Sequence, residues 1–363
     1  MTLRYGIFGA GVVVPMHLEG IAALDDVELV GISAPGDAHA LAEGAGTQAF
    51  TDNAELLAHG LDVAVICTPH PFHPALTIEA LAAGAHVLVE KPLAVEVRDA
   101  DAMIAAADDA GRLLGVCFQQ RFRPVVAAAR ELVAAGRLGD LIRVSIVDPL
   151  YRPNSYYGTA GWRGTWRGEG GGVLMNQAPH TLDLLCHLAG PPATAWGKAW
   201  RRSQPMEAED TATALLEFPG GGVGTLAVST TEPGVQRIEL VGERGRIEIV
   251  GETIAFERFE PPVSEHLPTA SGMFDAPERV PERVELPVGR GDHVDVHADF
   301  AAAVRSGGVP RIPAKDALWS LELANAIVLS TFTGRAVPLP VDREAYAALL
   351  ADLRTGKVTT TRR

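Results

Sequence analysis

The first 120 residues alternate short apolar runs with helix-like stretches, and this rhythm restricts the fold more than any other feature of the chain. RYGIFG, VAVIC and HVLVE are typical of strands, whereas GVVVPMHLEGIAAL and HPALTIEALAAG are typical of helices. VAVIC and HVLVE are apolar on both faces, as expected for a parallel sheet covered by helices on each side. The pattern therefore predicts an α/β fold with a doubly wound parallel sheet.

The apolar period changes in the second part of the chain. LIRVSIVD, DTATALLEF and QRIELVG alternate polar and apolar residues, which indicates antiparallel strands with one covered face. We expect two domains, a dinucleotide-binding domain over residues 1–122 and an α+β domain over residues 123–363. Helices within 291–334 should pack on the second sheet, and 260–283 should form a long irregular loop.

Composition excludes several kinds of partner. A net charge of -14 opposes binding to nucleic acid or to anionic membranes, which relies on clustered Lys and Arg. The chain starts directly with a strand pattern and has no apolar span of membrane length, so we expect a cytoplasmic protein. Cys67, Cys117 and Cys186 stand singly in apolar runs, which predicts core thiols and neither disulfides nor zinc.

A glycine turn follows the first strand. Gly9 and Gly11 are spaced so that the backbone can approach a pyrophosphate, with Val12 and Val13 leading into the helix. Val14 occupies the third position of G-x-G-x-x-G, so a plain strand-to-helix turn is the alternative. Because the turn opens an alternating βα series, we favour dinucleotide binding.

The end of the second strand bears on the choice of cofactor. An acid here would hold the adenosine ribose of NAD, but Ser33 stands at this position and Asp37 is the next charge. Because position 33 carries no carboxylate, nothing there repels a 2'-phosphate. No neighbouring Arg attracts one either. We lean slightly to NADP and leave NAD open.

Three later turns fall where open α/β sheets bind ligands, beyond the carboxyl ends of strands. In the first turn, CTPHPFH, we expect His73 either to contact the nicotinamide side of the cofactor or to cap the next helix. His70 and His73 have no third ligand at matching spacing, so we expect no metal here. In the second, Lys91 would polarise a substrate oxygen, although a surface salt bridge with Glu90 is the alternative. The third turn, QQRFRP, follows the sixth strand and offers polar residues for the rim of the site or for a domain junction. The predicted cofactor contacts from these turns are Thr68, Pro69, His73, Glu90, Lys91 and Gln119, with Gln120 as a substrate contact.

A glycine-led apolar segment carries polar residues at helical spacing. Asn176, His180 and Asp183 fall in one stripe, and Pro179 predicts that the regular helix starts close to it. His180 could accept a hydroxyl proton near neutral pH, or be a core histidine satisfied by Asn176 or Asp183. His293 and His297 also stand four apart, but the sequence lacks the Glu of a zinc helix, which again speaks against metal.

The loop YYGTAGWRGTWRGEGGG precedes this segment. Its aromatics, arginines and glycines suit a loop that folds over a polar ring, and a solvent loop is the alternative. We predict substrate contacts from Arg163 and Trp166.

These motifs together resemble the family of glucose-fructose oxidoreductase, inositol dehydrogenase and rhizopine-catabolism proteins (Gfo/Idh/MocA). The resemblance rests on GAG, CTPHPFHPALTIEALAAGAHVLVEKPLA, QQRFRP, GWRGTWRGEGGGVLMNQAPHTLDLL and the closing AKDALWSLELANAIVLSTFTGRAVPLPVD. It implies a Rossmann domain, a C-terminal domain with a large open mostly antiparallel sheet, and NAD(P)-dependent redox chemistry on sugars or cyclitols. It also implies a homo-oligomer, a dimer or tetramer, formed through that sheet.

The resemblance also implies roles for particular residues. The lysine of EKP maps to Lys91, which assists proton transfer, and the family's Asp and His map to Asn176 and His180. The Trp-Arg pair near the nicotinamide maps to Trp162 and Arg163. Because an amide replaces the usual Asp, we assign proton chemistry to His180 and Lys91 and substrate orientation to Asn176.

Three functions follow as hypotheses. The leading one is hydride transfer between NAD(P) and a secondary hydroxyl of a sugar, glycoside or cyclitol. A second is redox-neutral glycoside cleavage or elimination through a transient ketone, with the cofactor retained. A third is a noncatalytic dinucleotide-sensing protein, against which the presence of both Lys91 and His180 argues.

Overall fold

The computed structural model describes residues 2–36 and 38–362, and its contacts divide the chain into two units. Unit 1 comprises residues 1–122, 168–170 and 290–321, and unit 2 comprises 123–167, 171–289 and 322–363. The predicted domain boundary placed residues 290–321 in the second domain, but the contacts place this segment in unit 1. None of the helices among the described residues combines the length and apolar character that a bilayer crossing requires.

Among the described residues, unit 1 is built on a six-stranded parallel sheet in the order β3-β2-β1-β4-β5-β6, which confirms the predicted doubly wound fold. Strands β4 and β5 are almost entirely buried, as their two-sided apolar sequences predict. The order reverses between β1 and β4, which is where such sheets bind ligands. The strands are β1 Leu3–Phe8, β2 Val27–Ser33, β3 Gln48–Phe50, β4 Val63–Ile66, β5 His86–Glu90 and β6 Leu114–Cys117.

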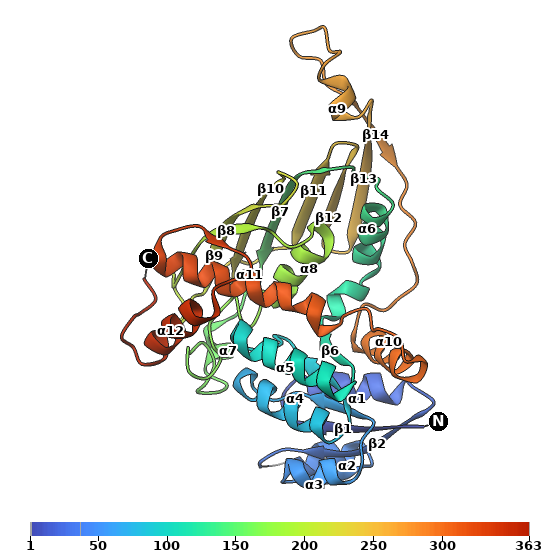
Figure 1. Ribbon diagram of the computed structural model, residues 1–363, viewed down its shortest axis with the longest axis vertical. Coiled ribbons are helices and arrows are strands. Elements are labelled where there is room, and N and C mark those ends of the chain that lie inside the picture. Colours follow the sequence, from blue (N-terminus) through green and yellow to red (C-terminus); the bar gives the residue numbers. More distant parts are fainter. Residues whose placement is uncertain (1, 37, 363) are drawn as a thin grey trace. The chain divides into compact units, whose positions relative to one another are not determined.

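Helices cover this sheet, and α4 packs beside α5 (Figure 1). Helix α10 lies against α1, where a side chain at Gly20 would come within 2.5 Å of the His297 ring. This close packing, together with a bridge between Gly115 and Pro313, explains why the segment from residue 290 joins unit 1. The helices are α1 Val14–Ala22, α2 His39–Gly44, α3 Asn53–Ala58, η1 His70–Phe72, α4 His73–Ala82, α5 Val97–Ala110, η2 Gln119–Phe122, α10 His293–Ser306 and α11 Ala314–Thr333, whose last turns belong to unit 2.

Unit 2 contains a nine-stranded sheet, counted over the residues described, in the order β14-β13-β12-β11-β7-β10-β9-β8-β15. It is antiparallel except where β10 pairs with β7, so the mostly antiparallel prediction is confirmed. Segment 260–283 is not wholly irregular, because it contains α9 and the strand β14. The strands are β7 Leu141–Pro149, β8 Thr194–Trp200, β9 Thr211–Glu217, β10 Val223–Ser229, β11 Arg237–Gly242, β12 Gly245–Val250, β13 Thr253–Glu260, β14 Glu278–Glu282 and β15 Val337–Pro338.

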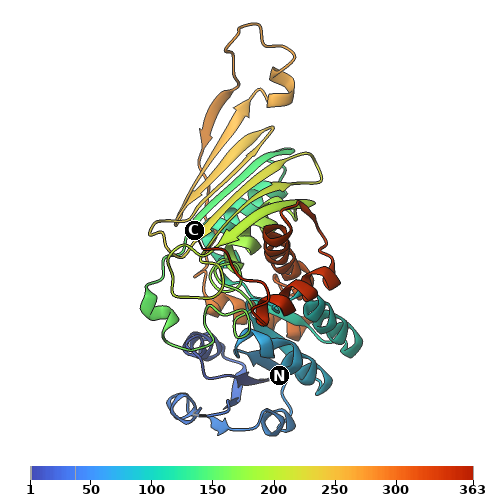
Figure 2. The ribbon, with the colours of Figure 1, turned by 90° about the vertical axis from the view of Figure 1, so that its left-hand side faces the viewer.

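The covered face of this sheet carries α6 and α8 (Figure 1). Helix α9 and the loop after it connect β13 to β14 and extend beyond the ends of the other strands (Figure 2). The helices of unit 2 are α6 Pro124–Ala134, α7 Asn154–Tyr157, α8 Pro179–Ala189, α9 Val263–His266 and α12 Arg343–Arg354.

Candidate active site

The predicted glycine turn has the geometry that a pyrophosphate requires. Gly9 adopts a φ of +119°, and a side chain there would come within 2.5 Å of the Cys67 carbonyl oxygen, so only glycine fits. Gly11 is exposed and Val12 is 82% exposed, directly before α1 begins at Val14. The backbone here is open to solvent at a helix N-terminus, which favours an anion.

The end of β2 differs from its predicted role. Ser33 is completely buried, and its hydroxyl donates to Asn53 Oδ1 at 2.7 Å. This hydroxyl is therefore committed to Asn53 at the start of α3, and the residues that follow it, Pro35 and Gly36, are exposed. Asp37 lies outside the described residues.

His73 links two strand-end turns of unit 1. Its Nε2 lies 2.9 Å from the Thr68 carbonyl oxygen, and its Nδ1 lies 2.9 Å from that of Pro92. Burial lowers the pKa of this imidazole, although its backbone hydrogen bonds oppose that shift. The completely buried ring therefore holds the turns after β4 and β5 together, which replaces both roles inferred from the sequence, cofactor contact and helix cap.

Glu90 and Lys91 end β5 in different environments. Glu90 is buried, which argues against the surface salt bridge considered for this pair. Its Oε1 lies 3.0 Å from His17 Nε2, and its Oε2 accepts the Lys91 N–H at 3.1 Å. Burial raises the pKa of Glu90, but its hydrogen bond with His17 and the nearby His293 imidazole outweigh that effect and hold the pKa well below its usual range. The Glu90 side chain is therefore placed to support Lys91 rather than to reach a cofactor, whereas Lys91 is partly exposed.

The sheet brings the remaining predicted residues of unit 1 to one edge. They follow the carboxyl ends of four strands: Gly9–Val13 after β1, Thr68–Pro69 after β4, Lys91 after β5 and Gln119–Gln120 after β6. Thr68, Pro69, Gln119 and Gln120 are all partly exposed. This edge can bind a dinucleotide across the point where the strand order reverses.

Gly171 and Gly172, the part of the glycine run that belongs to unit 2, lie beside Glu209, a residue that no sequence motif pointed to. A side chain at Gly172 would come within 1.8 Å of the Glu209 carbonyl oxygen. The buried Glu209 carboxylate accepts the N–H groups of Gly172 and Leu174 at 3.0 and 3.1 Å. Close approach to the backbone, rather than flexibility, explains this part of the glycine run.

Helix α8 begins at Pro179, which confirms the expected helix start. Asn176 therefore lies in the turns before the helix, His180 is partly exposed in its first turn, and Asp183 is buried. His180 keeps the exposure that a general base needs.

Tyr156 is the centre of the polar cluster around Asn176; it opens the aromatic loop quoted from the sequence, but it was not predicted as a site residue. Its hydroxyl oxygen accepts hydrogen bonds from Arg163 Nη1 at 2.5 Å, Asn176 Nδ2 at 3.1 Å and Gln177 Nε2 at 3.3 Å. The Arg163 guanidinium also lies 4.4 Å from the centre of the Tyr156 ring and 4.8 Å from that of Trp162. These contacts fix the loop before α8 and orient the Asn176 amide.

Trp166 is removed from the predicted substrate contacts. Its indole is 1% exposed, donates to Thr360 Oγ1 at 3.1 Å and packs edge-on against Phe332. Both Trp162 and Arg163 remain partly exposed and available to a ligand.

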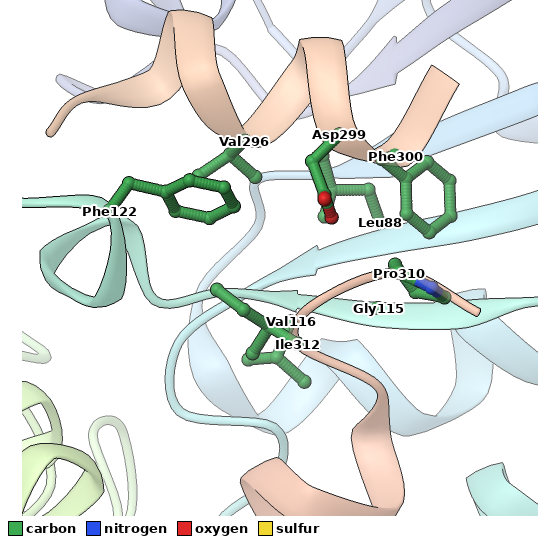
Figure 3. A pocket seen from close by; sticks show the side chains of 9 residues that line it. All are labelled: Leu88, Gly115, Val116, Phe122, Val296, Asp299, Phe300, Pro310 and Ile312. Carbon is green, nitrogen blue, oxygen red and sulfur yellow. The ribbon is translucent and has the colours of Figure 1, made fainter. Parts of the chain in front are cut away.

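A small cavity lies inside unit 1. It measures about 10 Å³ and is walled by Val296, Phe300 and Phe122, with the Asp299 carboxyl at its side (Figure 3). This is room for about one water molecule, so the cavity is a packing defect and not a substrate pocket.

A parallel sheet with an open glycine turn, a switch point and a lysine at its carboxyl edge defines a dinucleotide-binding oxidoreductase class. Residues 3–118 match the model of the oxidoreductase family with an NAD-binding Rossmann fold, and residues 126–248 match the GFO/IDH/MocA C-terminal domain. The chain belongs to the Gfo/Idh/MocA oxidoreductase family.

Individual relatives agree with this assignment. The chain is 27% identical to 1,5-anhydro-D-fructose reductase of Ensifer adhaerens over 93% of its own length and 98% of the relative's. It is 31% identical to D-glucoside 3-dehydrogenase of Escherichia coli, over 67% of this chain and 75% of the relative. The WlbA dehydrogenase of Bordetella pertussis, solved with NADH and UDP-GlcNAcA, is 29% identical, covering 94% of this chain and 100% of the other with a TM-score of 0.81.

Proposed function

We propose that the protein transfers hydride between NAD(P) and a secondary hydroxyl or ketone of a sugar, glycoside or cyclitol. The observation that carries the proposal is Lys91, a partly exposed cation at the carboxyl edge of an NAD-binding sheet. The sugar and glycoside chemistry of the similar enzymes supports this substrate class.

In the proposed mechanism, His180 and Lys91 act on the same alcohol. His180 takes the hydroxyl proton, while the Lys91 ammonium stabilises the negative charge that develops on the oxygen. A nicotinamide cofactor bound at the carboxyl edge of the unit 1 sheet would supply the hydride-accepting and hydride-donating chemistry. Glu90 supports Lys91 by accepting its backbone N–H.

Asn176 orients the substrate in this proposal. Its Nδ2 is held by Tyr156, which leaves the amide oxygen to accept a hydrogen bond from a substrate hydroxyl. Arg163, stacked beside Trp162, is the second polar contact that we assign to the sugar.

For the cofactor, we retain the slight preference for NADP, with NAD as the alternative. The residues Ala34, Pro35 and Gly36 after β2 include no acid that would repel a 2'-phosphate. A cytoplasmic location also remains our prediction.

We further propose a homo-oligomer through the uncovered face of the unit 2 sheet. Trp196 on β8 and Leu215 on β9 are directly paired, and with Val223 on β10 they place large exposed apolar side chains on that face. Adjacent apolar side chains of this kind are typical of association surfaces.

A substrate screen tests the proposed function. Purified protein is offered inositols, pyranoses and glycosides with NAD or NADP, and reduced-cofactor absorbance is followed. We expect turnover with at least one of these compounds, and Lys91→Met should abolish it while circular dichroism stays unchanged. Lys357→Met makes the same change on an exposed side chain and should retain full rate.

Each alternative function has its own signature in the same screen. Product formed without net cofactor reduction would select redox-neutral glycoside cleavage. Cofactor binding with no turnover of any compound would select a dinucleotide sensor. Full activity of Lys91→Met would refute its catalytic role.

A further inference from the structure

A second group of reactive side chains lies inside unit 1. His17 from α1, Glu90 from the end of β5, Cys117 from the end of β6 and His293 from the start of α10 are all buried. Each offers one ligand atom, and these atoms all lie within 4.8 Å of one another. Such a group is unusual in an apolar interior, where polar side chains need partners to offset their desolvation.

The Glu90 carboxylate forms the middle of the cluster. Its Oε1 lies 3.0 Å from His17 Nε2 and 3.4 Å from His293 Nε2, while Oε2 is anchored by the Lys91 N–H. Zn²⁺ binds nitrogen and oxygen at about 2.0–2.2 Å and sulfur at about 2.3 Å, so its tetrahedral ligands lie about 3.3–3.8 Å apart. The two Glu90–histidine distances are already close to this spacing, and the upper limit of 4.8 Å for the whole cluster exceeds it by about 1 Å.

Two further contacts match the surroundings of a metal ligand. His17 Nδ1 lies 2.9 Å from His297 Nε2, and a hydrogen bond at the second ring nitrogen fixes the ring orientation and tautomer of a metal-binding histidine. His293 Nε2 is aimed at Glu90 but makes no hydrogen bond to any residue that the structure describes, although this side chain is only 7% exposed. A cation between these groups would satisfy it.

We propose that His17, Glu90, Cys117 and His293 form a structural metal site suited to Zn²⁺. A thiolate, two imidazoles and a carboxylate are ligands that Zn²⁺ accepts, and four protein ligands in a buried position leave no place open for substrate. The ion would join α10 to α1 and to the ends of β5 and β6. Spacing in the sequence gives no sign of this site, because each ligand comes from a different element.

The test measures metal in the full-length protein. Protein produced with zinc in the medium and dialysed extensively should retain about one zinc per chain, measured by mass spectrometry. Protein prepared with Co²⁺ instead should show thiolate-to-cobalt charge-transfer absorption. Cys117→Ser should lose this absorption, and Cys186→Ser, which changes a buried cysteine of unit 2, should keep it.

A second variant and a stability measurement cover the risk of misfolding. His293→Ala should bind zinc at least 10- to 100-fold more weakly, a loss expected even for an outer partner of a metal ligand. The zinc-loaded wild type should also melt several degrees above protein prepared with a chelator, because an ion that binds only the folded state stabilises it.

Two results would overturn the proposal. One is wild-type protein that holds no zinc and shows no cobalt charge-transfer absorption, which would establish a metal-free hydrogen-bond network. The other is bound zinc that neither Cys117→Ser nor His293→Ala reduces, which would place the ion elsewhere.

Discussion

Replacing Tyr156 with Phe removes one oxygen atom and leaves the ring in place. That oxygen accepts hydrogen bonds from Arg163, Asn176 and Gln177, so three donors lose their common partner. The cation-π contact of Arg163 with the ring remains available. Tyr156→Phe therefore isolates the part of the cluster that orients Asn176.

The size of the effect follows from these contacts. A hydrogen bond to a charged donor contributes about 1.5–3 kcal/mol and a neutral one about 0.5–1.5 kcal/mol. A hydroxyl oxygen has two lone pairs, so three bonds to it do not add fully. Arg163 is also partly exposed and can recover water. We expect a loss of about 1–3 kcal/mol in unfolding free energy.

The same change should lower kcat/KM about 10- to 100-fold, which corresponds to about 1.4–2.7 kcal/mol of transition-state stabilisation. Steady-state kinetics with the substrate found in the screen and denaturant unfolding measure the two effects separately. Tyr151→Phe is the matched control, because it removes the same atom from an exposed side chain of the same segment. If both variants behave like the wild type, Tyr156 does not organise the site.

Two further predictions concern stability. Burial lowers the pKa of His70 to about 3, whereas a histidine of the unfolded chain has a pKa of about 6.5. As the pH falls from 6.5 to 3, the unfolded chain therefore binds a proton at His70 before the folded protein does. The stability that neutral His70 contributes is complete above pH 6.5 and is lost towards pH 3. In this pH range, His70→Gln should therefore reduce the slope of unfolding free energy against pH by about 1.4 kcal/mol per pH unit. An unchanged slope would contradict the assignment. Gly172→Ala should lower the unfolding free energy by at least about 4 kcal/mol, or prevent folding, because its methyl group would meet the Glu209 carbonyl. Gly220 has open space around it, so Gly220→Ala should change the unfolding free energy by less than about 0.5 kcal/mol. Equal melting temperatures of the two variants would refute the close-approach argument.

Features set by neighbouring residues were predictable from the sequence. The glycine turn at Gly9 follows from the strand before it and the helix after it, and the start of α8 follows from the missing N–H of Pro179. The two sheet types follow from apolar runs and polar-apolar alternation. Each of these depends on a few consecutive residues.

Features that depend on distant contacts were not predictable in this way. The Trp-rich composition of the loop suggested a ligand contact at Trp166, but only the fold shows that Thr360 and Phe332 occupy its indole. The bond between Tyr156 and Asn176 spans 20 residues, and that between His17 and His297 spans 280. Periodicity carries no information on such pairs.

The most direct test of the central claim is a double-mutant cycle on Lys91 and His180, with kcat/KM measured for the wild type, Lys91→Met, His180→Ala and the double variant. If both side chains act on one alcohol, kcat/KM of the double variant should lie no more than about threefold below that of the less active single variant. The reason is that the effects of residues acting as a unit are strongly non-additive. If the two losses multiply instead, the groups act independently and the shared-alcohol mechanism is contradicted.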